Sequence, residues 1–199
     1  MKDRIENYFK ASGIPHSEVE SLVQHYYITY GLAIRGLVER HPEVDIRDYD
    51  EKVDGALPLE IILKEDPALR SMIQSMNIGK KWLFTNAGES HAKRVVSILG
   101  LDGLFHGVTF CNYLAPQFVC KPDRRSFEKA MEEAGVTDPS LCYFVDDSSA
   151  NVEMATQVGW NAVHLLEDPA EDSSSGKFRI HSIKDLPQVM PELWETSMK

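Results

Sequence analysis

Two short apolar segments of the chain each stop abruptly on polar side chains. Residues 81–84 run directly into Thr85-Asn86, and residues 142–145 run directly into Asp146-Asp147. Short buried strands with polar groups at their carboxyl ends are the way in which open α/β sheets build binding sites. We therefore expect a parallel α/β sheet whose carboxyl edge holds the functional residues.

Beyond residue 80 the chain alternates between short apolar runs and stretches of helical periodicity. This alternation predicts a parallel sheet with helices on both faces. The expected strands are residues 81–84, 107–111, 141–145 and 161–165, and the expected helices are residues 90–99, 125–133 and 150–158.

Residues 1–70 are predicted to be helical. An apolar and aromatic stripe recurs at helical spacing between residues 19 and 30, after a capping-box pattern at residues 17–20. Gly31 is expected to break that run, and Pro67 is expected in the first turn of a further helix. We therefore expect two domains, a helical one over residues 1–70 and an α/β one over residues 71–199.

The composition argues against several classes of function. A net charge of −10 over 199 residues would repel nucleic acid, and no basic stripe offsets it. No apolar run is long enough to span a membrane, and no apolar segment follows the first residues as a secretory signal requires. The three cysteines have no metal-binding spacing and are expected to be buried thiols of a reducing compartment. We expect a cytoplasmic protein, with the nucleus as a second location, that binds a small molecule; its oligomeric state stays open.

Thr85 and the acid pair carry the most specific chemistry. A hydroxyl between a strand and a helix can bond an anion, helped by the amides of the helix N-terminus, or it can be the N-cap of that helix. The adjacent carboxylates Asp146 and Asp147 repel each other unless a cation or donors neutralise them. Magnesium prefers one or two carboxylates with waters and phosphate oxygens. The alternative for the acid pair is a cap for the next helix.

Lys121 lies between these two segments in the chain, directly before Pro122. By itself it is an ordinary surface lysine. In a strand–helix series that also offers a hydroxyl and an acid pair, its ammonium group would offset the charge of phosphate and of the acids.

Taken together, three segments resemble motifs two, three and four of the haloacid dehalogenase-like hydrolase superfamily, in the same order and with similar spacing. They are Leu83-Phe84-Thr85-Asn86, Cys120-Lys121-Pro122 and Phe144-Val145-Asp146-Asp147-Ser148. Residues 26–37 are similar to the cap segment of the pyrimidine 5′-nucleotidase branch found in fungi. The likeness runs from residue 1 to about residue 194. It implies a Rossmann-like three-layer core, lacking its first strand, with a helical cap domain.

In that family a magnesium-dependent hydrolysis of phosphomonoesters runs through an aspartyl-phosphate. The resemblance implies that Thr85 binds a phosphate oxygen with Asn86 beside it, and that Lys121 neutralises charge on the phosphate and the nucleophile. It also implies that Asp146 coordinates Mg²⁺, and that Asp147 supports the ion directly or through water. Positioning and electrostatic stabilisation are the main catalytic effects in phosphoryl transfer.

The family's nucleophile belongs to a motif that residues 1–199 do not contain. It is an aspartate of an Asp-x-Asp pair on the first, central strand, ahead of the cap. Asp48-Tyr49-Asp50 has the spacing but follows no apolar strand, and we predict a solvated acidic loop there and a turn at Asp54-Gly55. Three explanations stay open: a reading frame that begins upstream, a short form that is unstable or rearranged, and a non-catalytic relative. The uncapped start at Met1 favours the first, and the activity of the chain as written is left open.

The cap sets substrate specificity in this family. Tyr26, Tyr30 and Arg35 are expected to face a nucleobase or a sugar, because aromatic faces stack bases; the alternative is that the tyrosines form the cap core. The resulting hypothesis is dephosphorylation of pyrimidine nucleoside monophosphates such as UMP and CMP. The alternatives are a generalist sugar-phosphate phosphatase and a protein that binds a nucleotide or a partner without turnover. A dehalogenase is a weaker alternative, because that reaction does not require magnesium ligands.

Overall fold

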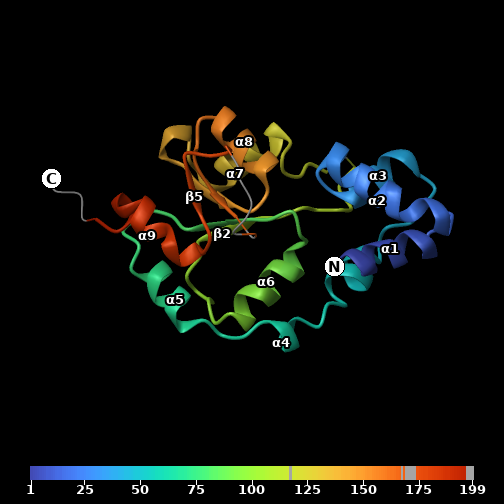
Figure 1. Ribbon diagram of the computed structural model, residues 1–199, viewed down its shortest axis with the longest axis horizontal. Coiled ribbons are helices and arrows are strands. Elements are labelled where there is room, and N and C mark those ends of the chain that lie inside the picture. Colours follow the sequence, from blue (N-terminus) through green and yellow to red (C-terminus); the bar gives the residue numbers. More distant parts are fainter. Residues whose placement is uncertain (117, 167, 169–173, 196–199) are drawn as a thin grey trace. The chain divides into compact units, whose positions relative to one another are not determined.

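The computed structural model describes residues 1–116, 118–166, 168 and 174–195. Contacts divide the chain into two compact units. Unit one comprises Met1–Glu65, Phe84–Leu99 and Phe110–Lys121, and unit two comprises Asp66–Leu83, Gly100–Thr109 and Pro122–Lys199. Figure 1 labels the helices of both units together with strands β2 and β5.

Unit one is helical. Its elements are α1 (Lys2–Ala11), α2 (His16–Tyr30), α3 (Ala33–Arg40), a π-helical turn (Asp50–Asp54), α4 (Leu59–Ile62) and α6 (Glu89–Ile98). Gly31 ends α2 at φ 80°, a left-handed conformation that glycine adopts without strain, as predicted. The predicted capping box is wrong. Pro15, at φ −55°, is the N-cap of α2, so Ser17 already lies inside the first turn.

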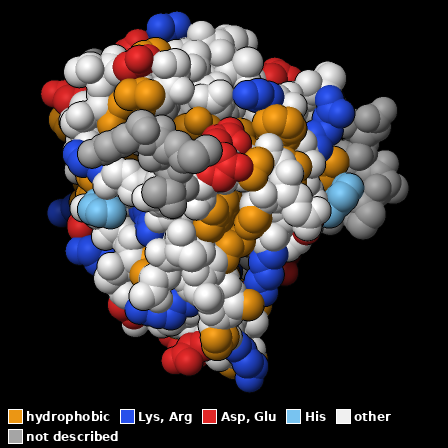
Figure 2. All heavy atoms as spheres, turned by 90° about the vertical axis from the view of Figure 1, so that its left-hand side faces the viewer, with side chains coloured by type: hydrophobic (Ala, Val, Ile, Leu, Met, Phe, Trp, Pro, Cys, Tyr) orange, Lys and Arg blue, Asp and Glu red, His pale blue; other side chains and the backbone are white. Residues whose placement is uncertain are grey.

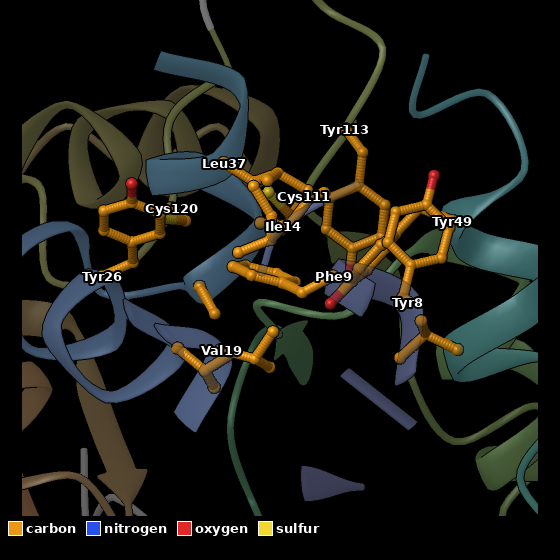
Figure 3. Packing of buried hydrophobic residues seen from close by; sticks show 14 of the residues in the cluster. Tyr8, Phe9, Ile14, Val19, Tyr26, Leu37, Tyr49, Cys111, Tyr113 and Cys120 are labelled. Atoms are coloured by element: carbon orange, nitrogen blue, oxygen red, sulfur yellow. The ribbon is translucent and has the colours of Figure 1, made fainter. Parts of the chain in front are cut away.

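The core of unit one is rich in aromatic rings, as Figure 3 shows. Tyr8 meets Tyr49 edge to face with ring centroids 5.0 Å apart, and Tyr49 meets Tyr113 in the same way at 5.2 Å. Such aromatic pairs contribute stability to a core in addition to the contribution from the apolar area that they bury. Helices α2 and α3 approach so closely at Gly36 that a side chain there would enter the ring of Tyr26.

Unit two carries the larger sheet. Its elements are α5 (Pro67–Gln74), β1 (Trp82–Phe84, whose last residue falls in unit one), β2 (Gly107–Thr109), α7 (Arg124–Ala134), β3 (Tyr143–Asp146), α8 (Ser149–Gln157), β4 (Asn161–Leu165), β5 (Phe178–Ile180) and α9 (Leu186–Val189), with short 3₁₀ turns at Pro139–Leu141, Ile183–Asp185 and Pro191–Leu193. Strands β3, β4 and β5 form a parallel sheet in which Asp146 is the register partner of His164. Helix α8 packs on β3 and β4.

Strands β1 and β2 form a second sheet, separate from the first within the residues that the structure describes. The strand that ends before Thr85 and the strand that ends on the acid pair therefore belong to different sheets. This agrees with the resemblance, which implies a core that lacks its first, central strand.

The strand–helix alternation predicted after residue 80 is confirmed. Each of the four predicted strands and three predicted helices is present, with every end within two residues of its predicted position. Sequence reasoning missed β5, because the charged Arg179 interrupts its two apolar residues and no apolar run marks the strand. Asp66 caps α5 by accepting a hydrogen bond from Leu69 N–H, with Pro67 in the first turn as predicted. The predicted domain boundary near residue 70 stays a prediction.

Among the described residues, no helix has both the length and the apolar character needed to cross a membrane.

Candidate functional site

The loop after β1 presents Thr85 and Asn86 in unit one. The Thr85 hydroxyl accepts a hydrogen bond from Ala87 N–H at 3.0 Å, which tightens the turn and keeps the hydroxyl proton for another acceptor. The alternative that Thr85 caps α6 is wrong, because the N-cap is Gly88, which has no side chain to bond the helix. The first amides of α6 thus lack a capping side chain, and this favours an anion beside the loop.

Lys121 is held against this loop through both its backbone and its side chain. Asn86 Nδ2 donates to the Lys121 carbonyl at 2.9 Å, and Lys121 N–H donates to Asn86 Oδ1 at 2.7 Å. Lys121 Nζ donates to the Phe84 carbonyl at 2.8 Å and lies 4.9 Å from the centroid of the Phe84 ring. The residue is only 5% exposed, so it is not the surface lysine that its sequence context alone suggests. Burying an ammonium group costs free energy unless neighbouring groups compensate its charge. The contacts of Lys121 Nζ supply this compensation, and they hold the group in a defined place.

Asp146 ends β3 in unit two, and Asp147 follows it as an exposed residue. Asp146 Oδ1 accepts hydrogen bonds from Ser148 N–H at 2.9 Å and from Asn151 Nδ2 at 2.8 Å. Ser148 itself is the N-cap of α8. These two bonds fix the orientation of the Asp146 carboxylate at the carboxyl end of the parallel sheet.

Sequence reasoning missed two residues that support the acid pair. Asn151 reaches Asp146 from the first turns of α8. His164 is fully buried on β4, and its Nε2 donates to the Asp147 carbonyl at 3.1 Å. The signal that could have found His164 is a histidine in the middle of an apolar strand, beside the strand that carries the acids.

The acid pair fits a magnesium ion by the chemistry of its donors. Mg²⁺ is usually held by one or two carboxylates, with waters and phosphate oxygens completing its octahedral shell. Asp146 and Asp147 supply two carboxylates. No group of three or more His, Cys, Asp or Glu residues suited to a metal ion occurs in the described part of the chain. An ion at this position would therefore take most of its ligands from water and substrate.

Two of the predicted cap residues are tyrosines of α2. Tyr26 is 4% exposed and belongs to the core of unit one, where its hydroxyl lies 3.1 Å from His41 Nε2. Tyr30 is less buried, and its hydroxyl accepts a hydrogen bond from Arg40 Nε at 2.8 Å. Tyr26 thus occupies the place that the core alternative gives it, whereas Tyr30 lies nearer to the surface.

Arg35, the third predicted cap residue, lies next to the segment that carries Lys121. Its Nε is 3.3 Å from Glu39 Oε1, and its Nη1 donates to Cys120 Sγ at 3.9 Å. Cys120 Sγ in turn donates to the Tyr30 carbonyl at 3.4 Å. Within unit one the structure therefore brings Tyr30, Arg35 and the Lys121 segment together.

The acidic segment at residues 48–50 is not the solvated loop that its composition predicts. Tyr49 is buried in the core, and Asp50 begins the π-helical turn with its Oδ1 sealed from water. Asp54, at the end of that turn, is buried and accepts a hydrogen bond from the Tyr113 hydroxyl at 2.8 Å. Burial raises the pKa of the Asp50 carboxyl, and the Asp54 carboxylate raises it further. Packing of the neighbouring tyrosines draws these acids inward, and the local sequence contains no sign of that packing.

Acidic and basic side chains are interspersed with apolar ones on the face drawn in Figure 2, and they form no continuous basic field there. The chain as a whole carries a net charge of −10. An anionic substrate would therefore be attracted by local cations such as Lys121 rather than by the average charge of the molecule.

Comparisons with known proteins point to one family. A family model of haloacid dehalogenase-like hydrolases matches residues 2–159. Phosphate metabolism protein 8 of Saccharomyces cerevisiae is 35% identical over 208 residues, which cover 98% of the chain and 64% of that relative. The chain thus spans less than two thirds of the length of this curated relative.

Solved structures of the haloacid dehalogenase (HAD) type share the fold. A HAD phosphatase from Thermococcus onnurineus matches with a TM-score of 0.62 at 16% identity, over 94% of the chain and 86% of that protein. A HAD hydrolase from Bacillus subtilis, bound to magnesium, matches with a TM-score of 0.59 at 14% identity, over 94% of the chain and 89% of that protein. At these identities the likeness concerns the fold alone, and it confirms the predicted HAD-type α/β fold.

Proposed function

Because the chain belongs to the haloacid dehalogenase-like hydrolase family, we propose that it serves the magnesium-dependent hydrolysis of nucleoside 5′-monophosphates, with pyrimidine nucleotides such as UMP and CMP as substrates. The observation that carries the proposal is the reciprocal pair of hydrogen bonds between Asn86 and Lys121. This pair anchors the backbone of Lys121, whose buried ammonium group donates to the Phe84 carbonyl at the carboxyl end of β1, one residue before Thr85.

In the proposed reaction the residues of unit one bind the phosphate. The Thr85 hydroxyl donates to a phosphate oxygen, and Lys121 offsets negative charge on the phosphate. Asn86 positions Lys121 and keeps one amide proton for an oxygen of the substrate. A charged group that is already oriented in a setting of low dielectric stabilises developing charge more strongly than water does.

The acid pair of unit two would hold the metal. When bound, Mg²⁺ neutralises charge on phosphate oxygens. Asp146 would be its ligand through a carboxylate that Ser148 and Asn151 orient, and Asp147 would support it directly or through water. His164 fixes the Asp147 carbonyl and with it the course of the chain after β3. Metal ligands generally depend on such supporting bonds for their orientation.

The proposed reaction also needs a nucleophile that attacks phosphorus and an acid that protonates the leaving alcohol. In the family these are the two aspartates of the Asp-x-Asp motif, which residues 1–199 do not contain. We expect turnover from a protein that includes such a motif, and nucleotide binding without turnover from residues 1–199.

Further support is indirect. The yeast relative is named for phosphate metabolism, which favours a phosphoester over a halogenated acid as the substrate. Tyr30 and Arg35 would face the sugar or the base, with Tyr26 in the core beneath them. Cys111 and Cys120 are buried as expected, whereas Cys142 is only partly buried, and none of the three forms a disulfide. This suits the proposed location in a reducing compartment, the cytoplasm or the nucleus.

Phosphate release from UMP, CMP, AMP and ribose 5-phosphate tests the proposal. The assay uses the protein isolated from its natural source, with Mg²⁺ and with EDTA. Release that is faster from UMP and CMP than from AMP, and that EDTA abolishes, is the expected result. Equal release from AMP would contradict pyrimidine specificity, and equal release from ribose 5-phosphate would favour a generalist phosphatase. Nucleotide binding without release would favour the binding protein.

A further inference from the structure

A pocket of about 160 Å³ opens in unit one beside the loop that follows β1. Three segments of the unit line it: the first contributes Ile46, Arg47 and Asp50, the second residues 88–90, and the third residues 110–114. A cavity of about 150 Å³ is enough to hold a single six-membered ring. The pocket is therefore of the right size for one such ring.

Asp50 lines this pocket with a carboxylate that is only partly satisfied by the described residues. Its Oδ1 is sealed from water and has no hydrogen-bond partner in the described part of the chain. This oxygen lies so close to Gly88 that a Cβ added there would be 2.6 Å from it. Oδ2 is not sealed, so it is the oxygen that a ligand in the pocket can reach. A half-buried carboxylate is costly, and a ligand N–H donated to Oδ2 would offset part of that cost while Oδ1 stays sealed.

The rest of the lining suits a flat ring with polar edges. Ile46, Phe110 and Leu114 supply apolar surface. Asn112 supplies an amide whose Oδ1 accepts a hydrogen bond from Leu114 N–H at 3.2 Å, which leaves its Nδ2 for a ring carbonyl. Arg47, Glu89 and Ser90 also line the pocket, so its wall combines apolar and polar side chains. Small-molecule sites use a few oriented polar groups to fix the ligand against apolar surface.

The pocket adjoins the residues proposed to bind phosphate. Gly88, in its wall, follows Asn86 by two residues on the same loop. The hydroxyl of Tyr113, another lining residue, lies 3.2 Å from the Asn86 carbonyl and 2.8 Å from Asp54 Oδ2. A ligand with its phosphate at Thr85 and its ring in this pocket would therefore lie along a single stretch of unit one.

We propose that this pocket binds the pyrimidine base of the nucleotide, with the Asp50 carboxylate accepting N3–H of uracil or the 4-amino group of cytosine. The inference rests on the proposed function and names the residue that selects the base. The one-ring volume disfavours a bicyclic purine. Asp50 acts in binding and specificity, away from the phosphorus.

Calorimetric titration of residues 1–199 with UMP, CMP, AMP, uridine and ribose 5-phosphate tests this inference. We expect UMP and CMP to bind about tenfold more tightly than ribose 5-phosphate, since a hydrogen bond to a charged group contributes on this scale. Asp50→Ala should abolish that advantage and leave the affinity for ribose 5-phosphate unchanged. Asp48→Ala is the matched control, because Asp48 lies two residues away and pairs with Tyr8 and Lys52 outside this pocket.

Gly88→Ala is a second variant, which displaces the Asp50 carboxylate without deleting it and should also lower the affinity for UMP. An unchanged ratio of UMP to ribose 5-phosphate affinity in Asp50→Ala would overturn the inference. Failure of the proposed function has a different signature. In that case Lys121→Met would leave the binding of UMP and ribose 5-phosphate unchanged, while uridine binding would still depend on Asp50.

Discussion

Lys121 combines near-complete burial with a charge that the proposed reaction uses. Its Nζ bonds the Phe84 carbonyl and lies over the ring of the same residue. A cation–π contact of this kind contributes about 0.5–2 kcal/mol, and the carbonyl dipole adds to it. Local contacts therefore offset part of the desolvation cost, and a phosphate ion would offset more of it.

Replacing Lys121 by Met keeps the length of the side chain and removes its charge. We expect the affinity of residues 1–199 for inorganic phosphate to fall about tenfold or more, because a charge-assisted hydrogen bond contributes about 1.5–3 kcal/mol. Calorimetric titration measures the change. Lys64→Met is the control, because Lys64 is an exposed lysine of the same unit. Unchanged phosphate affinity in Lys121→Met would remove this residue from the site.

Asp50 links the pocket to the pH dependence of stability. Burial and the Asp54 carboxylate raise the pKa of its carboxyl, and His91 acts in the opposite direction. A group whose pKa is raised by folding binds its proton more tightly in the folded state. Its contribution to stability is therefore fully present below the unfolded-state pKa of about 4 and is lost as the pH rises through the folded-state pKa.

Asp50→Asn should accordingly raise the melting temperature at pH 7 and leave it nearly unchanged near pH 3, where the wild-type carboxyl is protonated. Thermal melts of both proteins at pH 3, 5 and 7 measure the difference. Asp48→Asn should have the opposite sign at pH 7, because Asp48 is paired with Lys52 and Tyr8. Equal melting temperatures of wild type and Asp50→Asn at pH 7 would show that burial does not destabilise this carboxylate.

At the scale of elements, the packing of α2 against α3 depends on one missing side chain. A Cβ on Gly36 would lie 2.3 Å from Cγ of Tyr26, whose ring is fixed in the core. The helices can come this close only because position 36 has no side chain. The same contact holds Tyr26 in place as a core residue.

Gly36→Ala should therefore destabilise the protein by about 1–3 kcal/mol, the usual cost of overpacking a core. Alanine favours a helix interior by about 1 kcal/mol over glycine, so the clash has to outweigh that gain. Urea denaturation measures the change. Gly79→Ala is the control, because an added Cβ there meets no atom within 4 Å. A variant Gly36→Ala as stable as wild type would mean that the Tyr26 ring can move.

At the scale of the whole molecule, surface ion pairs set the response to acid. The Arg47 guanidinium holds the pKa of Asp45 at about 2, and Arg94 does the same for Glu60. A hydrogen bond to Lys184 lowers the pKa of Asp66. Acids whose pKa is lowered by folding stabilise the protein above their unfolded-state pKa and lose that contribution as the pH falls through the folded-state pKa.

We therefore expect the melting temperature to fall as the pH drops from about 4 to about 2, the interval between the unfolded-state and folded-state pKa values. Circular dichroism melts across that range measure the slope. Glu60→Gln should make the slope shallower, and 1 M salt should do so for wild type as well, because salt screens exposed pairs. An acid response that neither change affects would point to buried groups instead.

Much of the fold could be predicted from local signals. Apolar runs of strand length that end on polar groups located the strands before Thr85 and through Asp146. Helical periodicity located α6 and α7 between these strands and α8 after them. Such signals depend on only a few neighbouring residues, so they can be recognised without knowledge of the rest of the chain. The same short range explains the misses, because Arg179 interrupts the apolar residues of β5, and Pro15 rather than Ser17 is the N-cap of α2.

Local patterns in the sequence are enough to give the α/β order, the family resemblance and the candidate phosphate and metal residues. The surroundings of those residues come from the three-dimensional packing. Asn86 and Lys121 bond each other across 35 positions of the chain, and His164 reaches Asp147 across 17. The packing of the chain also turns Asp50 toward the core, where it lines a pocket. Burial and long-range hydrogen bonds depend on residues that only folding brings together, and no local pattern in the sequence records them.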